Sequence, residues 1–253
     1  MKFIFKKILF FIFLASLVSC GSRKEIVYLQ DIEDKSSYES AKIYDPKLQS
    51  DDLLSIVVSA ESPEVTVPFN IPEIEGNDAK NKGFKTYLID NTGYVDFPVI
   101  GKIKLGGLTR AEASSKLIAL ISEYIKSPTV SIRIVNYKVS VLGEVIKPGS
   151  FNIPGERITI LEALGLAGDL TIYGKRENVL VIREIEGKKT YTRLNLTQAN
   201  IFDSPFYYLS QNDVVFVEPN KTKINASKIG ADTTLTISAI SLLITITVLL
   251  VRN

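Results

Sequence analysis

The sequence contains no histidine and no tryptophan, and its single cysteine is Cys20. Without histidine there is no Ser-His-Asp or Cys-His machinery, and no zinc site of the usual histidine and cysteine kind. With one cysteine the chain can form neither an internal disulfide nor an iron–sulfur site. These absences argue against an enzyme, and we expect neither a cofactor nor a metal.

The chain has little net charge, with 30 Lys and Arg residues against 28 Asp and Glu residues. Three of the basic residues, Lys2, Lys6 and Lys7, fall in a segment expected to be removed, and no acid lies in residues 1–19. The mature balance is then 27 basic residues (30 minus 3) against 28 acidic residues. No basic field is available to recruit a polyanion, so nucleic acid is excluded as a partner.

Residues 1–19 have the pattern of a lipoprotein signal peptide. A basic start is followed by the apolar run Ile8–Val18, which is too short to span a bilayer, and then by small residues. The stretch 17–20 (Leu-Val-Ser-Cys) resembles the bacterial lipobox, in which the cysteine is acylated and becomes the first mature residue. We therefore predict lipid attachment at Cys20 and folded domains that face the periplasm. An ordinary signal peptide with a chance cysteine, or an uncleaved anchor, is the alternative.

The other end of the chain carries a long uncharged stretch. A linker is predicted at 221–232 and a transmembrane helix at 233–251, because nineteen helical residues would span roughly 28 Å. Three lysines precede this stretch and one arginine follows it, which favours an outer over an inner membrane. Hydroxyl side chains at steps of 4, 3 and 4 share one helix face, either lining a pore or packing on another helix, or else bonding to their own backbone. These residues are Thr234, Ser238, Ser241 and Thr245.

Between the two ends, a tether at 20–43 precedes a first domain predicted at 44–137. Thr109 and Glu112 have the spacing of a capping box and open a helix. Strands are expected on either side of this helix, with a long loop at 61–85. The expected strands are Leu53–Val58, a hairpin of Tyr87–Asp90 with Tyr94–Pro98, and Thr129–Tyr137.

A second domain is predicted at 138–220, also of the α+β class. Pro148 and Gly149 suit a type II turn, with the positive φ at the glycine. Thr159 and Glu162 repeat the capping-box spacing, and Gly168 is placed to end the short helix as its left-handed residue. The remaining expected elements are a hairpin of Val179–Ile182 with Tyr191–Leu194 and a last strand at Val214–Val217.

The joint order of these motifs resembles a known family. The stretch 44–56 is similar to the opening of the Wza-type outer-membrane polysaccharide export proteins, with Ser50-Asp51 where Gly-Asp is usual. Further matches to that export domain are Asp90, Gly93, Pro98, Gly101 and the helix start at 107–109. The stretches 141–145, 147–149, 161–168 and 211–219 look like a soluble-ligand-binding β-grasp (SLBB) module.

The resemblance implies an α+β export domain, then one β-grasp-like SLBB domain, then a C-terminal transmembrane helix. It implies a lipid-anchored homo-oligomeric ring in the outer membrane that conducts capsular or extracellular polysaccharide passively. The implied partners are the polysaccharide, outer-membrane lipid and an inner-membrane polysaccharide copolymerase. The conspicuous glycines and prolines would then shape turns rather than bind ligand. They are Gly93, Gly143, Pro148, Gly149 and Gly168.

Two other interpretations remain open. One is an envelope lipoprotein that binds a soluble ligand or glycan through its β-grasp domain, with Tyr207 and Tyr208 either touching sugar or, more in keeping with their type, packing in the core. The other is a carboxylate-based glycan hydrolase. Adjacent acids on a strand point to opposite faces, which makes Asp51 and Asp52 a poor acid/base pair. The acids at 31, 33 and 34 lie in the polar tether.

Overall fold

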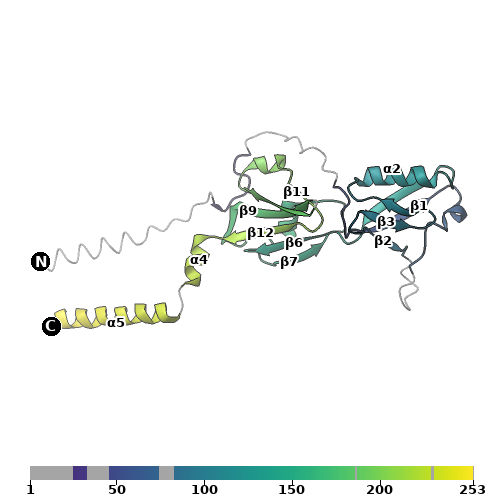
Figure 1. The fold of residues 1–253 in the computed structure, drawn as a ribbon. Coiled ribbons are helices and arrows are strands. Elements are labelled where there is room, and N and C mark those ends of the chain that lie inside the picture. The colour runs from purple at the N-terminus through teal and green to yellow at the C-terminus, as the bar shows by residue number, and fades with distance from the viewer. Residues whose placement is uncertain (1–24, 33–45, 74–82, 186, 229–230, 253) are drawn as a thin grey trace.

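The computed structural model describes residues 25–32, 46–73, 83–185, 187–228 and 231–252. The folded part is α+β and has two separate hydrophobic cores, each enclosed by its own strands and one helix. Figure 1 shows the two resulting domains side by side, with the C-terminal helix projecting from the far end of the second domain. The predicted lipid site, Cys20, lies outside the described residues.

The first domain is a three-stranded antiparallel sheet, a two-stranded hairpin and a helix. In the sheet, the central strand β1 alternates, with Leu54, Ile56 and Val58 buried. Such alternation indicates a strand with one face on the core. Strand order is β2-β1-β5, β3 pairs with β4, and α2 packs on β5. The bounds are β1 Leu53–Ser59, η2 Pro63–Thr66, β2 Thr86–Leu88, β3 Tyr94–Phe97, β4 Gly101–Lys104, α2 Arg110–Ile121 and β5 Thr129–Ile134.

The predicted hairpin between Tyr87–Asp90 and Tyr94–Pro98 is wrong, because β2 pairs with β1 and β3 pairs with β4. The turn itself forms: the Asp90 carboxylate accepts hydrogen bonds from the backbone N–H groups of Thr92 and Tyr94, 2.8 and 2.9 Å away. Beyond it the chains separate, since Ile89 donates its N–H to the carbonyl of Asp52 beside β1. A long-range partner therefore overrides the local pairing.

The second domain is a five-stranded mixed sheet in the order β10-β9-β12-β6-β7. β12 and β6 run parallel, and the other neighbours are antiparallel. The predicted hairpin at 179–194 is confirmed as β9 with β10. The bounds are β6 Lys138–Gly143, β7 Gly149–Asn152, β8 Ile158–Thr159, α3 Ile160–Leu166, β9 Gly174–Ile185, β10 Lys188–Leu194, η3 Ala199–Asp203, β11 Tyr208–Leu209 and β12 Val214–Pro219.

Each domain helix begins with the capping box predicted from its sequence. Thr109 accepts from the Glu112 N–H at 3.2 Å, and the Glu112 carboxylate accepts from the Thr109 N–H at 2.8 Å. Thr159 and Glu162 repeat both bonds at the start of α3. Because the first N–H groups of a helix have no partner within it, these side chains fix where each helix starts.

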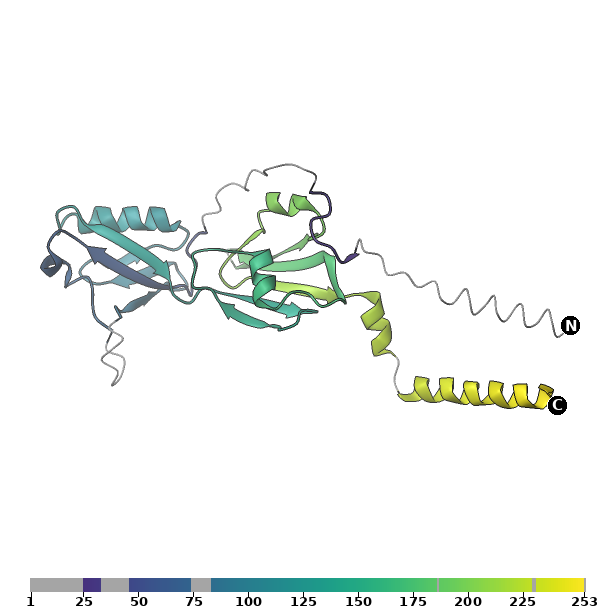
Figure 2. The same ribbon diagram turned by 180° about the vertical axis from the view of Figure 1, so that it is seen from behind.

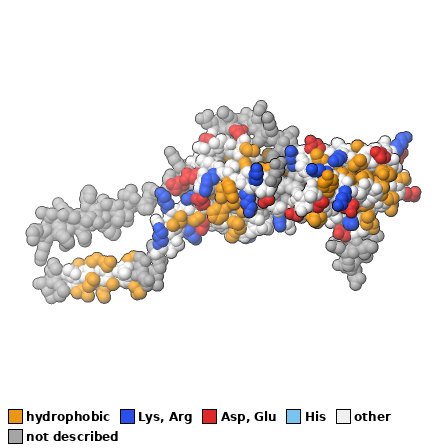
Figure 3. Space-filling view, viewed as in Figure 1, with side chains coloured by type: hydrophobic (Ala, Val, Ile, Leu, Met, Phe, Trp, Pro, Cys, Tyr) orange, Lys and Arg blue, Asp and Glu red, His pale blue; other side chains and the backbone are white. Residues whose placement is uncertain are grey.

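Two helices follow the second domain: α4, Lys221–Ser227, and α5, Ala231–Arg252. Within the described part of the chain, no helix combines the length and the apolar character that crossing a membrane requires. The prediction of a transmembrane helix at 233–251 is therefore wrong. Exposed apolar side chains run along α5, with threonine and serine among them (Figure 3).

Residues 25–32, which the sequence assigned to a tether, lie against the second domain; we call them the N-terminal strap. Leu29 and Gln30 donate their N–H groups to carbonyls at 196 and 197, 3.1 and 2.7 Å away. The Tyr28 hydroxyl donates to Asp169, and the Asp31 carboxylate accepts from the N–H of residue 199 at 2.6 Å. Figures 1 and 2 both place the strap and α4 toward the end of this domain that faces away from α2.

Candidate functional site at the domain junction

The same acidic turn precedes a core strand in each domain. In the first, Asp52 accepts from the N–H of Gln49, three residues earlier, at 2.8 Å and leads into β1. In the second, Asp213 accepts from the N–H of Ser210, again three residues earlier, at 2.7 Å and leads into β12. The residue before each aspartate is left-handed, with φ of 69° at position 51 and 64° at position 212. Asp and Asn are the non-glycine residues that adopt this conformation most readily.

In the second turn, the carboxylate of Asp213 forms a buried ion pair with Arg183. Arg183 on β9 binds Asp213 through Nε and Nη2, with Nη2 2.7 Å from Oδ2 and both side chains almost fully buried. Arg183 also donates to the Tyr208 carbonyl at 2.8 Å and stacks on the ring of Phe206. Burial raises the pKa of Asp213, while the guanidinium acts in the opposite direction. The hydrogen bonds compensate for desolvation, so the carboxylate is a fully partnered structural group.

The first turn lacks that partner. Asp52 is 0% exposed, and its Oδ1 meets no hydrogen-bond donor among the residues that the structure describes. Burial raises the pKa of Asp52 from 3.8 to about 6, against the opposing effect of the Gln49 N–H. A buried carboxyl with one unpaired oxygen is costly, and its presence requires a physical explanation.

Asn136, in the short connection between β5 and β6, links the two turns. Its side chain accepts from the N–H of Leu53 at 2.9 Å and donates to the carbonyl of Asp51 at 2.8 Å. Its backbone carbonyl accepts from the side chain of Gln211 at 2.9 Å, and Gln211 in turn accepts from the N–H of Lys138 at 2.7 Å. The connection between the domains is therefore held by hydrogen bonds on both sides.

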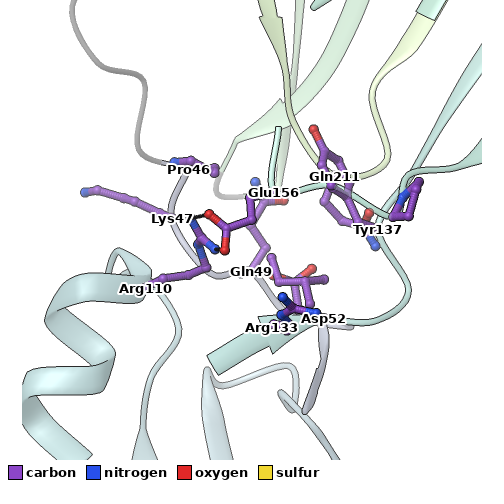
Figure 4. Close-up of a pocket in the computed structure, with 12 residues that line it drawn as sticks. Pro46, Lys47, Gln49, Asp52, Arg110, Arg133, Tyr137, Glu156 and Gln211 are labelled. Carbon is purple, nitrogen blue, oxygen red and sulfur yellow. Dashed lines mark hydrogen bonds and ion pairs between the residues drawn. The ribbon is translucent and has the colours of Figure 1, made fainter. Parts of the chain in front are cut away.

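A cavity of about 230 Å³ lies at this junction, between the first turn, the start of α2 and the loop before β8 (Figure 4). Across it, Arg110 of the first domain forms a bidentate pair with Glu156 of the second, at 2.6 and 2.8 Å. This pair holds the pKa of Glu156 below its usual range. The charged groups that line the cavity are Lys47, Asp52, Arg110, Arg133 and Glu156.

Of the glycines predicted to shape turns, Gly93, Gly143 and Gly168 have φ of 85°, 91° and 76°. At Gly143 a β-carbon would lie 2.0 Å from the carbonyl oxygen of Val217, so no other residue fits there. Gly149 differs from expectation: it has no positive φ and pairs with Val141 as the first residue of β7, after Pro148. The type II turn expected at this point is therefore wrong.

The hydroxyl residues of α5 are not brought together with the junction. Ser241 donates to the carbonyl of Ile237 at 2.9 Å, and Thr245 donates to that of Ser241 at 2.8 Å. The side chain of Thr234 lies outside what the structure describes, and Ser238 lies on the same helix. Their role in lining a conduit or packing helices stays a prediction.

The residues considered for hydrolysis or sugar contact do not form a catalytic pair. Asp51 is exposed whereas Asp52 is buried, and Asp31 of the strap accepts from the N–H of residue 199 in the second domain. Tyr207 and Tyr208 are half-buried, and the ring of Tyr207 packs edge-on against both Tyr208 and Phe202.

Sequence reasoning missed the junction because its members are far apart in the chain. The one available signal was the paired stretch Ser50-Asp51-Asp52 and Gln211-Asn212-Asp213, each leading into an apolar strand. The resemblance aligned Ser50 with the glycine that is usual in the family, whereas the residue with a positive φ is Asp51. The likeness between the two stretches was therefore hidden by one position. Neither Asn136 nor the Arg110–Glu156 pair carries a local pattern.

The fold defines a two-domain α+β protein with a mixed five-stranded sheet in its second domain. Residues 40–135 match the family described as polysaccharide biosynthesis/export protein, and residues 137–217 match the SLBB domain. The chain therefore carries a region similar to polysaccharide biosynthesis/export proteins, followed by a region similar to SLBB domains.

Two curated relatives are similar over most of the chain. The EPS I polysaccharide export outer membrane protein EpsA of Ralstonia solanacearum is 29% identical over 190 residues, covering 72% of this chain and 50% of the relative. The protein of the same name from Ralstonia nicotianae is 29% identical over 187 residues, covering 70% and 48% respectively. The chain therefore spans about half the length of the curated relatives it matches.

Proposed function

We propose that this protein is a subunit of an outer-membrane conduit that exports capsular or extracellular polysaccharide. The observation that carries the proposal is the order of the two domains, an export domain followed by an SLBB domain, in a chain similar to polysaccharide export outer membrane proteins. The transport is passive: the assembly supplies a path for the polymer, and other components supply the energy.

The N-terminal strap supports an orientation for this subunit. Acylated Cys20 lies five residues before Glu25, so the intervening chain reaches at most roughly 18 Å. Because the strap is bonded to the second domain, a lipid at Cys20 holds that domain against the outer membrane. The export domain then extends into the periplasm, toward an inner-membrane copolymerase.

We further propose that identical copies assemble into a ring, as an enclosed path for a polymer requires. Closed rings form when the same two surfaces of each copy meet head to tail around an axis. The hydroxyl face of α5, with Ser238, Ser241 and Thr245 and the preceding Thr234, is the proposed packing or lining surface between copies. Small polar side chains allow close approach of neighbouring helices.

Deletion of the gene tests the function directly. We expect loss of surface polysaccharide with synthesis of the lipid-linked precursor intact, and recovery when the wild-type chain is supplied. The variant Cys20→Ser should fail to restore export, whereas Arg193→Gln, at an exposed ion pair on β10, should restore it. Unchanged surface polysaccharide after deletion would exclude the conduit and favour a lipoprotein that binds a ligand or glycan.

A further inference from the structure

One end of the second domain carries exposed apolar side chains on three segments: the loop after β6, the end of α3 with the turn that follows it, and α4. Each of these side chains is between 38% and 61% exposed. Single exposed apolar side chains are ordinary on a protein surface, whereas a cluster of them marks an interaction site. We call this surface the domain tip. Its apolar members are Ile146, Leu166, Ile172, Tyr173 and Ile224.

Backbone hydrogen bonds hold the three segments of the tip against one another. The N–H groups of Ile146 and Lys147, in the loop after β6, donate to the carbonyls of residues 169 and 167 at 3.0 and 2.7 Å. The N–H of Asn220, the residue that caps α4, donates to the carbonyl of Tyr173 at 2.7 Å. The apolar side chains of these segments therefore share one surface.

The charges of the tip favour an anionic partner. On the three segments, Glu144 accepts from the Thr171 hydroxyl at 2.8 Å and lies 3.7 Å from the Lys223 ammonium. Asp169 accepts from the Tyr28 hydroxyl of the strap. Three exposed lysines on the same segments form no ion pair with any residue that the structure describes. These lysines are Lys147, Lys221 and Lys228.

The predicted lipid anchor reaches this same end of the domain. The strap contacts the tip through Tyr28, and Cys20 precedes Glu25, the first residue of the strap, by five residues, or at most roughly 18 Å. Figures 1 and 2 place the strap and α4 together at this end, and Figure 3 shows hydrophobic and basic side chains side by side next to α4. A lipid surface is therefore the partner that both the chemistry and the chain length favour.

We propose that the domain tip binds the surface of a phospholipid membrane that contains anionic lipid. The apolar side chains enter the boundary between headgroups and acyl chains, and the three lysines contact phosphates while their stems lie along apolar surface. The inference rests on the proposed function for the identity of the membrane, the inner leaflet of the outer membrane. It adds that the folded second domain itself contacts lipid, beside any acyl chain at Cys20.

The test measures how close the tip lies to lipid in the full-length acylated chain, reconstituted in vesicles of phosphatidylethanolamine and phosphatidylglycerol. Cys20 is the only native cysteine and has no free thiol once it is acylated, so a fluorophore attaches only to an introduced cysteine. Ile172→Cys places the fluorophore on the tip. Lipids brominated near the headgroup end of their acyl chains should quench it several-fold more than they quench the control.

The matched control is Ile185→Cys, which is also an exposed isoleucine of the second domain. Strand β9 begins at Gly174, whose N–H donates to Thr171 in the tip, and ends at Ile185. At about 3.3 Å per residue, this end of the strand lies roughly 36 Å from its start. Bromolipids should therefore leave the fluorophore at this position bright.

The lysines provide a second readout. Lys147→Gln and Lys221→Gln should each lower the ratio of lipid-bound to free tips about fivefold, the scale of one basic residue at an anionic surface. Replacing phosphatidylglycerol with phosphatidylcholine should act in the same direction. Lys189→Gln, at an exposed position on β10, is the control and should change nothing.

Equal quenching at the two labelled positions, or none at Ile172→Cys, overturns the proposal. Quenching that responds neither to the lysine variants nor to anionic lipid also overturns it, by showing contact with lipid without charge recognition. A fluorophore that lipid does not quench, but that the assembled particle shields from iodide in water, would place another copy on the tip. Failure here with gene deletion still blocking export removes only the lipid surface. Lipid contact that persists while deletion leaves export intact removes the conduit and retains the surface.

Discussion

The acidic turns before β1 and β12 both have a left-handed residue before the aspartate and a hydrogen bond from the N–H three residues earlier to its carboxylate. They differ in whether a second side chain partners that carboxylate. In the second domain Arg183 partners Asp213 completely, and the turn is part of the core. In the first domain Asp52 is as deeply buried, and its Oδ1 has no donor among the residues that the structure describes. The comparison shows that a local motif fixes where a carboxyl lies, whereas residues distant in the chain decide whether both of its oxygens are hydrogen-bonded.

The largest expected effect comes from breaking the paired turn. Arg183→Met should lower the free energy of unfolding by about 3–5 kcal/mol, because it leaves the Asp213 carboxylate buried without its counter-charge. Urea denaturation measures the loss, and hydrogen exchange should place it in β12 rather than β1. Arg193→Met, at a half-exposed ion pair, is the matched control and should cost less than about 1 kcal/mol. Equal effects of the two substitutions would contradict the account.

The second prediction concerns how Asp52 makes the free energy of unfolding depend on pH. Its folded-state pKa is raised to about 6 from 3.8, so the folded state holds the proton more tightly and stability falls as pH rises between about 4 and 6. Asp52→Asn removes this dependence, and its stability relative to wild type should rise by up to about 3 kcal/mol from pH 4 to pH 7.5. Denaturation curves at the two pH values measure the difference. A gap that does not change with pH would show that Asp52 titrates normally.

Substitution of Asn136 tests whether its hydrogen bonds stabilise the connection between the two domains. Asn136→Ala removes two side-chain hydrogen bonds to the first turn, and we expect a loss of about 1–3 kcal/mol. Hydrogen exchange should rise at Leu53, whose N–H loses its acceptor. Asn178→Ala, which removes one bond to Glu218 away from the junction, provides the comparison. Unaltered exchange at Leu53 would mean that the turn is held by other contacts.

The smallest effect is expected at the ion pair across the cavity. Glu156 is 61% exposed, so Glu156→Gln should cost at most about 1 kcal/mol in low salt, and less as salt is added. Because pairing holds the pKa of Glu156 low, the contribution is present above about pH 4.5 and disappears as pH falls below it. Thermal unfolding at two salt concentrations measures it. A large loss of stability that does not depend on salt would contradict the account, because it would mean that this pair behaves like the buried pair of Arg183 and Asp213.

What could be predicted from the sequence is mostly local. The capping boxes at Thr109 and Thr159 and the long hairpin of β9 with β10 follow from residues within a few positions of one another. The pairing of β2 with β1 could not be predicted in this way, because β1 lies more than thirty residues earlier in the chain.

The candidate site was less predictable than the fold. Asp52 and Asp213 were visible as residues, yet their difference depends on Arg183, thirty positions before Asp213, which has no counterpart beside Asp52 within the described part of the chain. The C-terminal stretch shows the opposite error. Lack of charge predicted a membrane span, whereas no helix among the described residues has the length and apolar character that a span requires.

The central claim is that this chain works as one of many copies in an export assembly. The measurement that tests it most directly is the mass of the complex extracted from outer membranes in mild detergent, with the native N-terminus intact. The account predicts a discrete particle of many subunits. A monomer or dimer would contradict it and would favour a lipoprotein that binds a soluble ligand or glycan through its β-grasp domain.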